Sequence, residues 1–271
     1  SDGTEVPALG QGTWTMGEDP RRRAEELATL REGIDRGASL IDTAEMYGEG
    51  AAEELVGEAV AGRRDAVFLV TKVYPWNASR AGTIAACERS LKRLKTDRID
   101  LYLLHWRGDH PLAETVAGFD ALVKAGKIRR WGVSNFDLAD MREVTATEGG
   151  GGCATDQVLY NPSRRGIEWD LLPWARSVGL PIMAYSPLEQ ARLLDHPQLR
   201  AIAEDHGTSP ARLVLAWVLG HDGVVAIPKT SSRRRLAENL GALDLCLTPD
   251  LAHALDRVFP PPRRASPLDM L

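Results

Sequence analysis

The sequence predicts a (β/α)8 barrel of the TIM type, because short apolar runs alternate with helix-type repeats along almost its whole length. Eight runs have the length and composition of buried strands, near residues 7–13, 40–43, 67–71, 99–104, 130–133, 155–159, 181–184 and 224–227. The segments between them carry apolar residues three or four positions apart; Leu27, Leu30 and Ile34, for example, share one helical face. Eight strand–helix units in 271 residues match the size of such a barrel.

The alternative fold is a doubly wound open sheet, and two missing motifs argue against it. Such a sheet normally carries a Gly-rich phosphate loop after its first strand. Here that strand is followed by GTWTMGEDP, which lacks the GxGxxG spacing, and the glycine run 149–152 is followed by Cys and Ala, which is not a P-loop. No break in composition divides the chain, so we expect residues 1–271 to form a single domain.

Charge and composition disfavour several classes of protein. The chain has 33 Lys plus Arg against 38 Asp plus Glu, a net charge of -5, so we expect no nucleic-acid partner. No apolar run approaches the ~20 residues of a membrane span. The three cysteines contain no CxxC pair, which argues against a disulfide framework or a zinc site. We therefore expect a cytoplasmic protein, a monomer or weak oligomer, with no membrane partner and no metal.

Four ionisable residues follow successive predicted strands. Asp42 lies at the end of the second strand run, Lys72 directly after the third and His105 directly after the fourth, while Tyr47 lies in the loop five residues beyond Asp42. Active sites of these barrels lie where the carboxyl ends of the strands meet. Each residue alone would more often be an ordinary packing or surface residue, but their joint placement favours a shared site.

These four side chains are suited to giving a proton to a carbonyl oxygen. A Tyr hydroxyl is a weak acid, with an unperturbed pKa of ~10. We expect the Lys72 ammonium to lower the pKa of Tyr47, and Asp42 to keep Lys72 charged and oriented. His105 can donate a hydrogen bond to the substrate oxygen. This equipment still needs a separate source of hydride or another electrophile.

The segment 227–239, at the end of the last predicted strand, is suited to binding a phosphate. Lys229, Thr230, Ser232 and Arg235 offer two positive charges and two hydroxyl groups at the start of a predicted helix. A compact dianion such as a ribose 2′-phosphate fits this set, because Arg binds phosphate through two parallel hydrogen bonds. A merely solvated basic turn is disfavoured there by the helix dipole.

Taken together, these motifs resemble the aldo-keto reductase family over nearly the whole chain. The segment 37–48, GASLIDTAEMYG, is similar to the motif that holds the family's catalytic Asp and Tyr. Thr71-Lys72 and the Leu-His-Trp sequence around His105 resemble its catalytic Lys and His. The resemblance implies that Tyr47 is the proton donor and that Asp42, Lys72 and His105 assist it.

The resemblance also implies a site for NADPH. Ser134 and Asn135, in WGVSNF, and Gln157 would hold the nicotinamide carboxamide, and Tyr185 would stack on the nicotinamide ring. The other residues that it assigns to the cofactor are Ser186, Leu188, Lys229, Thr230, Ser232, Arg235, Glu238 and Asn239, the last two facing the adenine.

Two segments depart from the family pattern. Family members usually begin with a β-hairpin that closes the barrel bottom, and here only its second half is expected, within residues 4–9. After Leu188 the chain reads Glu-Gln-Ala-Arg, where glycines are common in the family.

The implied activity is NADPH-dependent reduction of an aldehyde or ketone to an alcohol. Trp14, Trp76 and Trp106 follow the first, third and fourth strands and are expected to wall the pocket for a small-molecule carbonyl substrate. Two alternatives stay open. One is an NADPH-binding regulatory or channel-associated barrel subunit with little turnover. The other is a lyase or hydrolase without nicotinamide, which the Ser134-Asn135 pair and the basic segment disfavour.

Overall fold

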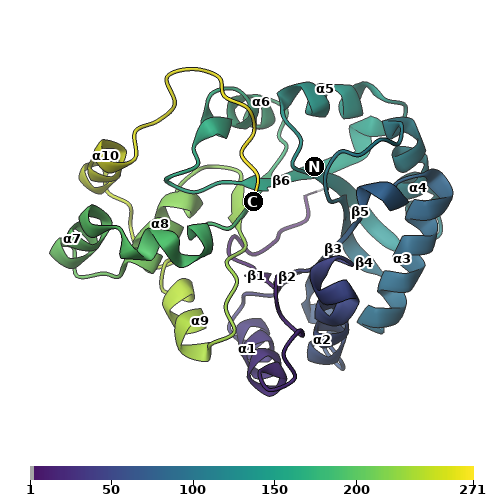
Figure 1. Cartoon of the computed structure of the whole chain (residues 1–271), viewed down its shortest axis with the longest axis horizontal. Helices are drawn as coiled ribbons and strands as arrows, with labels where there is room; N and C mark the ends of the chain where they lie inside the picture. The colour runs from purple at the N-terminus through teal and green to yellow at the C-terminus, as the bar shows by residue number, and fades with distance from the viewer. Residues whose placement is uncertain (1–2) are drawn as a thin grey trace.

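Eight strands lie side by side in the order of the sequence and form one parallel sheet at the centre of the molecule (Figure 1). The computed structural model describes residues 3–271. Each strand overlaps one of the ranges predicted from the sequence. The strands are β1 (Gln11–Gly12), β2 (Leu40–Asp42), β3 (Phe68–Val73), β4 (Ile99–Leu104), β5 (Ile128–Ser134), β6 (Cys153–Leu159), β7 (Ile182–Tyr185) and β8 (Val224–Ala226).

The last strand joins the first, so the sheet closes into a barrel. Isolated parallel bridges connect Leu9 with Ala226 and Gly12 with Lys229, and the Gly10 N–H donates to the Ala226 carbonyl at 2.8 Å. A Cβ at Gly12 would lie 2.8 Å from the Ile227 carbonyl oxygen, so glycine permits the close approach of this seam. The prediction of a (β/α)8 barrel is confirmed, because a doubly wound sheet would reverse its strand order.

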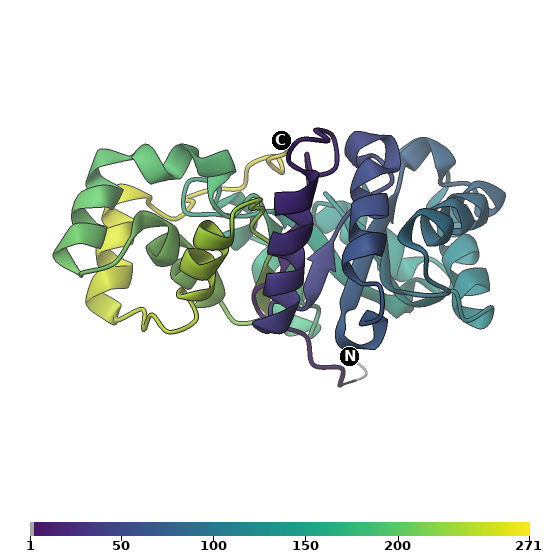
Figure 2. The ribbon, with the colours of Figure 1, turned by 90° about the horizontal axis from the view of Figure 1, so that it is seen from below.

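Helices cover the outside of the barrel, as Figures 1 and 2 show. Their apolar faces pack against the outer side of the sheet in one large core. α8 begins with a typical cap: Ser209 accepts a hydrogen bond from the Arg212 N–H, and Pro210 is the first helical residue. The helices are α1 (Arg23–Asp35), α2 (Ala51–Ala59), α3 (Arg80–Leu94), α4 (Leu112–Lys124), α5 (Leu138–Ala146), α6 (Leu171–Ser177), α7 (Pro197–Asp205), α8 (Pro210–Leu219), α9 (Arg233–Leu240) and α10 (Pro249–Val258).

The N-terminal segment differs from the expected half-hairpin. Residues 4–9 form no strand, and only Leu9 bridges to the sheet. Pro7 lacks the N–H that a ladder requires, which accounts for the late start of β1.

The interior of the barrel sets the direction of the site residues. An apolar layer fills the barrel, made of Leu40, Val70, Leu101, Leu103, Met183, Val225 and Ile227. Side chains two residues apart on a strand point to the same side. Asp42 and Lys72 each lie two residues beyond a member of this layer, so they point into the barrel above an apolar floor.

A C-terminal segment crosses the same end of the barrel. After α10, residues 260–271, which we name the tail, run back over the sheet toward its centre (Figure 1). In Figure 2 the tail and the first described residues lie at opposite ends of the barrel. Met270 and Leu271 of the tail border the same cavity as Tyr47 and His105.

Candidate active site

One cavity of about 880 Å³ opens at the carboxyl ends of the strands. It extends from Trp14 and Trp106 past Tyr47 to the start of α9. This cavity is lined by all twelve residues that the resemblance assigned to the cofactor: Ser134, Asn135, Gln157, Tyr185, Ser186, Leu188, Lys229, Thr230, Ser232, Arg235, Glu238 and Asn239. Asp42, Tyr47 and His105 also line it.

The four ionisable residues meet beneath this cavity. The Lys72 Nζ lies 2.7 Å from the Asp42 Oδ2, 2.9 Å from the Thr43 carbonyl oxygen and 3.2 Å from the Tyr47 hydroxyl. Lys72 is fully buried and Asp42 nearly so. The Tyr47 and His105 rings meet edge to face, with centroids 5.8 Å apart. The predicted convergence of strand ends is therefore present.

The balance of burial and charge differs at Tyr47 from the sequence-based expectation. Burial raises the pKa of Tyr47, and this effect outweighs the neighbouring Lys72, which acts in the expected lowering direction. At Lys72, burial favours the neutral amine, but Asp42 and Tyr47 together raise its pKa above the ordinary value. At neutral pH Tyr47 thus keeps its proton while Lys72 stays charged, which is the state that a proton donor requires.

His105 is neutral at physiological pH. Burial, followed by the charge of Lys72, lowers the pKa of His105 well below its ordinary value of 6.5. Its Nδ1 is enclosed and has no hydrogen-bond partner among residues 3–271. A neutral imidazole carries one N–H donor, so His105 can offer a hydrogen bond without adding a charge beside Lys72.

A hydrogen-bonded group from β5, β6 and β7 forms the neighbouring wall. The Tyr185 hydroxyl donates to the Asn135 Oδ1 at 2.9 Å, and the Asn135 Nδ2 donates to the His105 carbonyl at 3.1 Å. Asn135 has a left-handed backbone, φ 60°, which Asn tolerates better than most residues. The Ser134 hydroxyl donates to the Gln157 carbonyl at 2.7 Å.

Gln157 has a second contact that the sequence did not predict. Its Nε2 donates to the Asp42 Oδ1 at 2.7 Å. Asp42 is thus held on one oxygen by Lys72 and on the other by Gln157, which fixes the plane of the carboxylate. The link joins the expected cofactor wall to the four ionisable residues across the barrel.

The far end of the cavity is rich in cations. Lys229 and Arg235, predicted from the sequence, are joined there by Arg22 and Arg234. Burial and the nearby Arg22 lower the pKa of the half-buried Lys229. Ser232 caps α9 without a side-chain hydrogen bond, so the first turn lacks an internal acceptor there. A phosphate dianion would offset the crowded positive charge, so these residues fit the phosphorylated end of NADPH.

The aromatic rim follows the sequence prediction at two of three positions. Trp14 and Trp106 line the cavity. Trp76 does not line it: its ring stacks on Tyr74 with centroids 4.1 Å apart, and 63% of the residue is exposed. Trp76 touches the rim only through the edge of Trp106, because the turn 75–77 carries it outward.

Sequence reasoning missed the residues that reach the cavity from outside the strand ends. Arg22 precedes α1, and Met270 and Leu271 belong to the tail. Arg22 stands in a run of three arginines at the start of α1, a local signal for an anion site that could have been used. Nothing in the local sequence of the tail indicates that it returns to the barrel.

Comparison with known proteins agrees with this geometry. The sequence model of the Aldo/keto reductase family matches residues 8–259. The chain belongs to this family. Methylglyoxal reductase YeaE of Escherichia coli K12 is 51% identical, over 100% of this chain and 97% of its own length. Glyoxal reductase of Bacillus subtilis 168 is 34% identical, over 94% and 90%.

A solved structure of similar sequence has the same fold. An aldo/keto reductase from Klebsiella pneumoniae, crystallised with NADP and acetate, is 54% identical and superposes with a TM-score of 0.96 over 98% of this chain and 96% of that one. The other solved relatives include a Klebsiella pneumoniae aldo-keto reductase in complex with NADPH. Residues 3–271 of this aldo-keto reductase contain no helix with the length and apolarity needed to cross a membrane.

Proposed function

We propose that this chain reduces a small aldehyde or ketone to an alcohol with NADPH, and that Tyr47 supplies the proton. The observation that carries the proposal is the contact of the Lys72 Nζ with both Asp42, at 2.7 Å, and the Tyr47 hydroxyl, at 3.2 Å, inside a cavity whose far end is cationic. Proton donor and phosphate site therefore share one continuous space of about 880 Å³.

When bound, NADPH supplies the hydride that reduces the carbonyl carbon. Tyr47 would give its proton to the carbonyl oxygen as negative charge develops there, because Lys72 stabilises the phenolate that remains. Asp42, fixed by Gln157, would keep Lys72 charged and in place. His105 would donate a hydrogen bond to the same oxygen and so orient it. Ser134 and Asn135 would bind the amide of the nicotinamide, and Tyr185 would support its ring.

We propose a small α-dicarbonyl compound, of the methylglyoxal type, as the substrate class to test first. Two relatives, each matched by this chain over at least nine-tenths of its length, are named as reductases of methylglyoxal and of glyoxal. Trp14 and Trp106 supply an apolar rim beside Tyr47. An apolar rim with few polar groups suits a small carbonyl compound better than a sugar acid.

The test follows NADPH absorbance with methylglyoxal, an aromatic aldehyde and a simple ketone. Tyr47→Phe should lower turnover by about 10²–10⁴-fold while the Kd for NADPH stays within about twofold, since the ring is kept. Full activity in Tyr47→Phe would remove Tyr47 as the acid. Tight NADPH binding without reduction of any carbonyl by the parent chain would favour the regulatory alternative, which no named relative supports.

We also propose a cytoplasmic location and a monomeric or weakly oligomeric state. The three cysteines of the chain are unpaired, as thiols are in a reducing compartment. Size-exclusion chromatography with light scattering would test the second point, and a stable tetramer would contradict it.

A further inference from the structure

The loop after β7 holds a left-handed backbone without glycine. Ser186, Glu189, Gln190 and Ala191 have φ angles of 45°, 50°, 55° and 71°. Non-glycine residues in this region cost about 1–3 kcal/mol each and persist only where the surrounding structure holds them. Most of the loop lines the cofactor cavity, so something nearby must fix it in this shape.

Glu189 is the anchor of this loop. It is only 5% exposed, and its Oε1 accepts from Arg164 at 3.0 Å and from Arg192 at 2.9 Å. The Asn161 Nδ2 donates to its Oε2 at 2.8 Å and to the Ser186 carbonyl at 3.0 Å. Burial raises the pKa of Glu189, but these donors outweigh burial and leave the pKa below its ordinary value. The carboxylate is therefore charged, and both of its oxygens accept hydrogen bonds.

Arg164 also holds the tail. Its Nη1 lies 3.3 Å from the Asp269 Oδ1, while its Nε and Nη2 bond Glu189. The next residues of the tail, Met270 and Leu271, line the active-site cavity. One guanidinium thus contacts the loop at the cofactor side and the tail at the substrate side.

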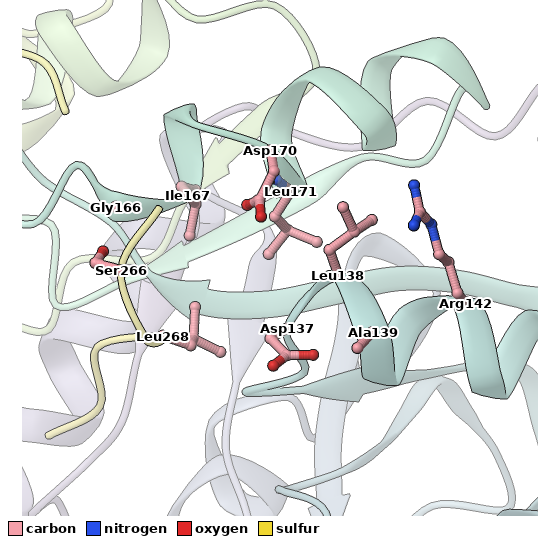
Figure 3. A pocket seen from close by; sticks show the side chains of 10 residues that line it. All are labelled: Asp137, Leu138, Ala139, Arg142, Gly166, Ile167, Asp170, Leu171, Ser266 and Leu268. Carbon is pink, nitrogen blue, oxygen red and sulfur yellow. The ribbon is translucent and has the colours of Figure 1, made fainter. Parts of the chain in front are cut away.

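Leu268 of the tail packs at the edge of the core, but the last two residues of the tail are poorly packed, since 52% of Met270 and 52% of Leu271 are exposed. Ser266 and Leu268 border a second cavity of about 260 Å³, opposite Asp137 and Arg142 (Figure 3). An open space beneath a segment provides few packing contacts to fix it. The Arg164–Asp269 pair is therefore placed to decide where Met270 and Leu271 lie.

We propose that Arg164 is a positioning residue that joins the 186–191 loop to the tail and so couples cofactor binding to carbonyl binding. The coupling to a carbonyl rests on the proposed function; the effect on cofactor binding does not. Arg is required because its planar group presents separate N–H donors to two carboxylates, which the single ammonium of Lys cannot match in geometry.

The test measures the Kd for NADPH by protein fluorescence, and separately the KM for the carbonyl. Arg164→Gln should raise the Kd for NADPH about 10- to 100-fold, corresponding to about 1.4–2.8 kcal/mol, and should also raise KM. Glu189→Gln should raise mainly the Kd. Asp269→Asn should raise mainly KM and leave the Kd within about twofold. Arg164→Lys should keep most NADPH affinity but lose the tail contact, and so resemble Asp269→Asn.

Arg165 provides a matched control. It is the next residue in sequence, pairs with Glu168 at 2.9 Å and Asp256 at 2.7 Å, and contacts neither the loop nor Asp269 in the described structure. Arg165→Gln should lower the melting temperature and leave the Kd for NADPH unchanged.

Several results would overturn the proposal. An unchanged Kd in Arg164→Gln would do so, as would an equal rise in Arg164→Gln and Arg165→Gln, which would mean a general loss of structure. If Arg164→Gln does not fold, Arg164→Lys and Asp269→Asn still test the proposal. The coupling is contradicted if both variants have the Kd for NADPH and the KM for the carbonyl of the parent. NADPH binding that responds as predicted in a chain without turnover would uphold the role of Arg164 in cofactor binding and refute the proposed function.

Discussion

Replacement of Asp42 by Asn tests the buried charge pair most directly. Asn keeps the size of the side chain and an oxygen that can accept from Lys72, but its amide nitrogen cannot accept from Gln157, so the change removes the charge and one hydrogen bond. At the observed 2.7 Å, two unit charges attract by about 6 kcal/mol at an effective dielectric constant of about 20. Desolvation offsets part of this, and loss of one partner from a buried pair costs about 3–5 kcal/mol.

That loss should be visible in thermal unfolding. For a chain of this size, 1 kcal/mol shifts the melting temperature by roughly 2–4 °C, so Asp42→Asn should melt about 6–20 °C below the parent at pH 7. The pKa of Lys72 should fall, since Asp42 is the larger of the two neighbours that raise it against burial. Far-UV circular dichroism, which reports secondary structure, follows the transition.

A double variant separates charge from shape. Asp42→Asn with Lys72→Met removes both charges and leaves no buried ion without a partner, so it should melt above Asp42→Asn alone. An Asp42→Asn chain that melts with the parent, or a double variant less stable than the single one, would refute the reasoning. On the alkaline side, the parent should lose the contribution of the pair as the pH rises through the raised pKa of Lys72.

Three further results are expected. Arg235→Ala should weaken NADPH by about tenfold or more and NADH much less, because Arg235 borders the proposed phosphate site; equal loss for both, measured by fluorescence titration, would contradict that role. The folded chain keeps His105 neutral, so stability should fall below about pH 6.5, where the unfolded chain gains a proton; His105→Phe should lose less stability between pH 7 and 5 in urea titrations, and an identical loss would count against it. Burial raises the pKa of Asp156 well above 3.8 and outweighs the Phe136 backbone N–H, which acts in the lowering direction; the free energy of unfolding should therefore fall as pH rises above about 3.8, and Asp156→Asn should flatten this slope between pH 4 and 6, whereas an unchanged slope would exclude Asp156 as its source.

Much of the site could be predicted from sequence because the end of a buried strand indicates where the next polar side chain lies in the barrel. An apolar run followed by one polar residue identifies both a buried strand and the end at which it leaves the core. Asp42, Lys72 and His105 satisfy that pattern on three neighbouring strands, so their meeting follows from the order of a parallel barrel. The same reasoning located the basic turn after β8.

The remaining features depend on contacts between distant segments. Tyr47 has a raised rather than a lowered pKa because the assembled walls bury its hydroxyl, and no short sequence encodes that burial. Trp76 faces outward because a turn rotates it away from the rim. Arg164 precedes Asp269 by more than a hundred residues, so only the folded chain brings the two together.

The short junction between β8 and β1 is where we expect the barrel to open first. β1 has two residues, β8 has three, and isolated bridges complete their junction. The proposed NADPH cavity spans this junction, since Gly12, Ile227 and Lys229 all border it. A bound cofactor would then contact both sides of this junction and stabilise it, contributing about 4 kcal/mol at a thousandfold excess over its Kd. Amide hydrogen exchange should slow on NADPH addition at residues 9–13 and 224–229 more than in β4 and β5; uniform slowing would contradict this local effect.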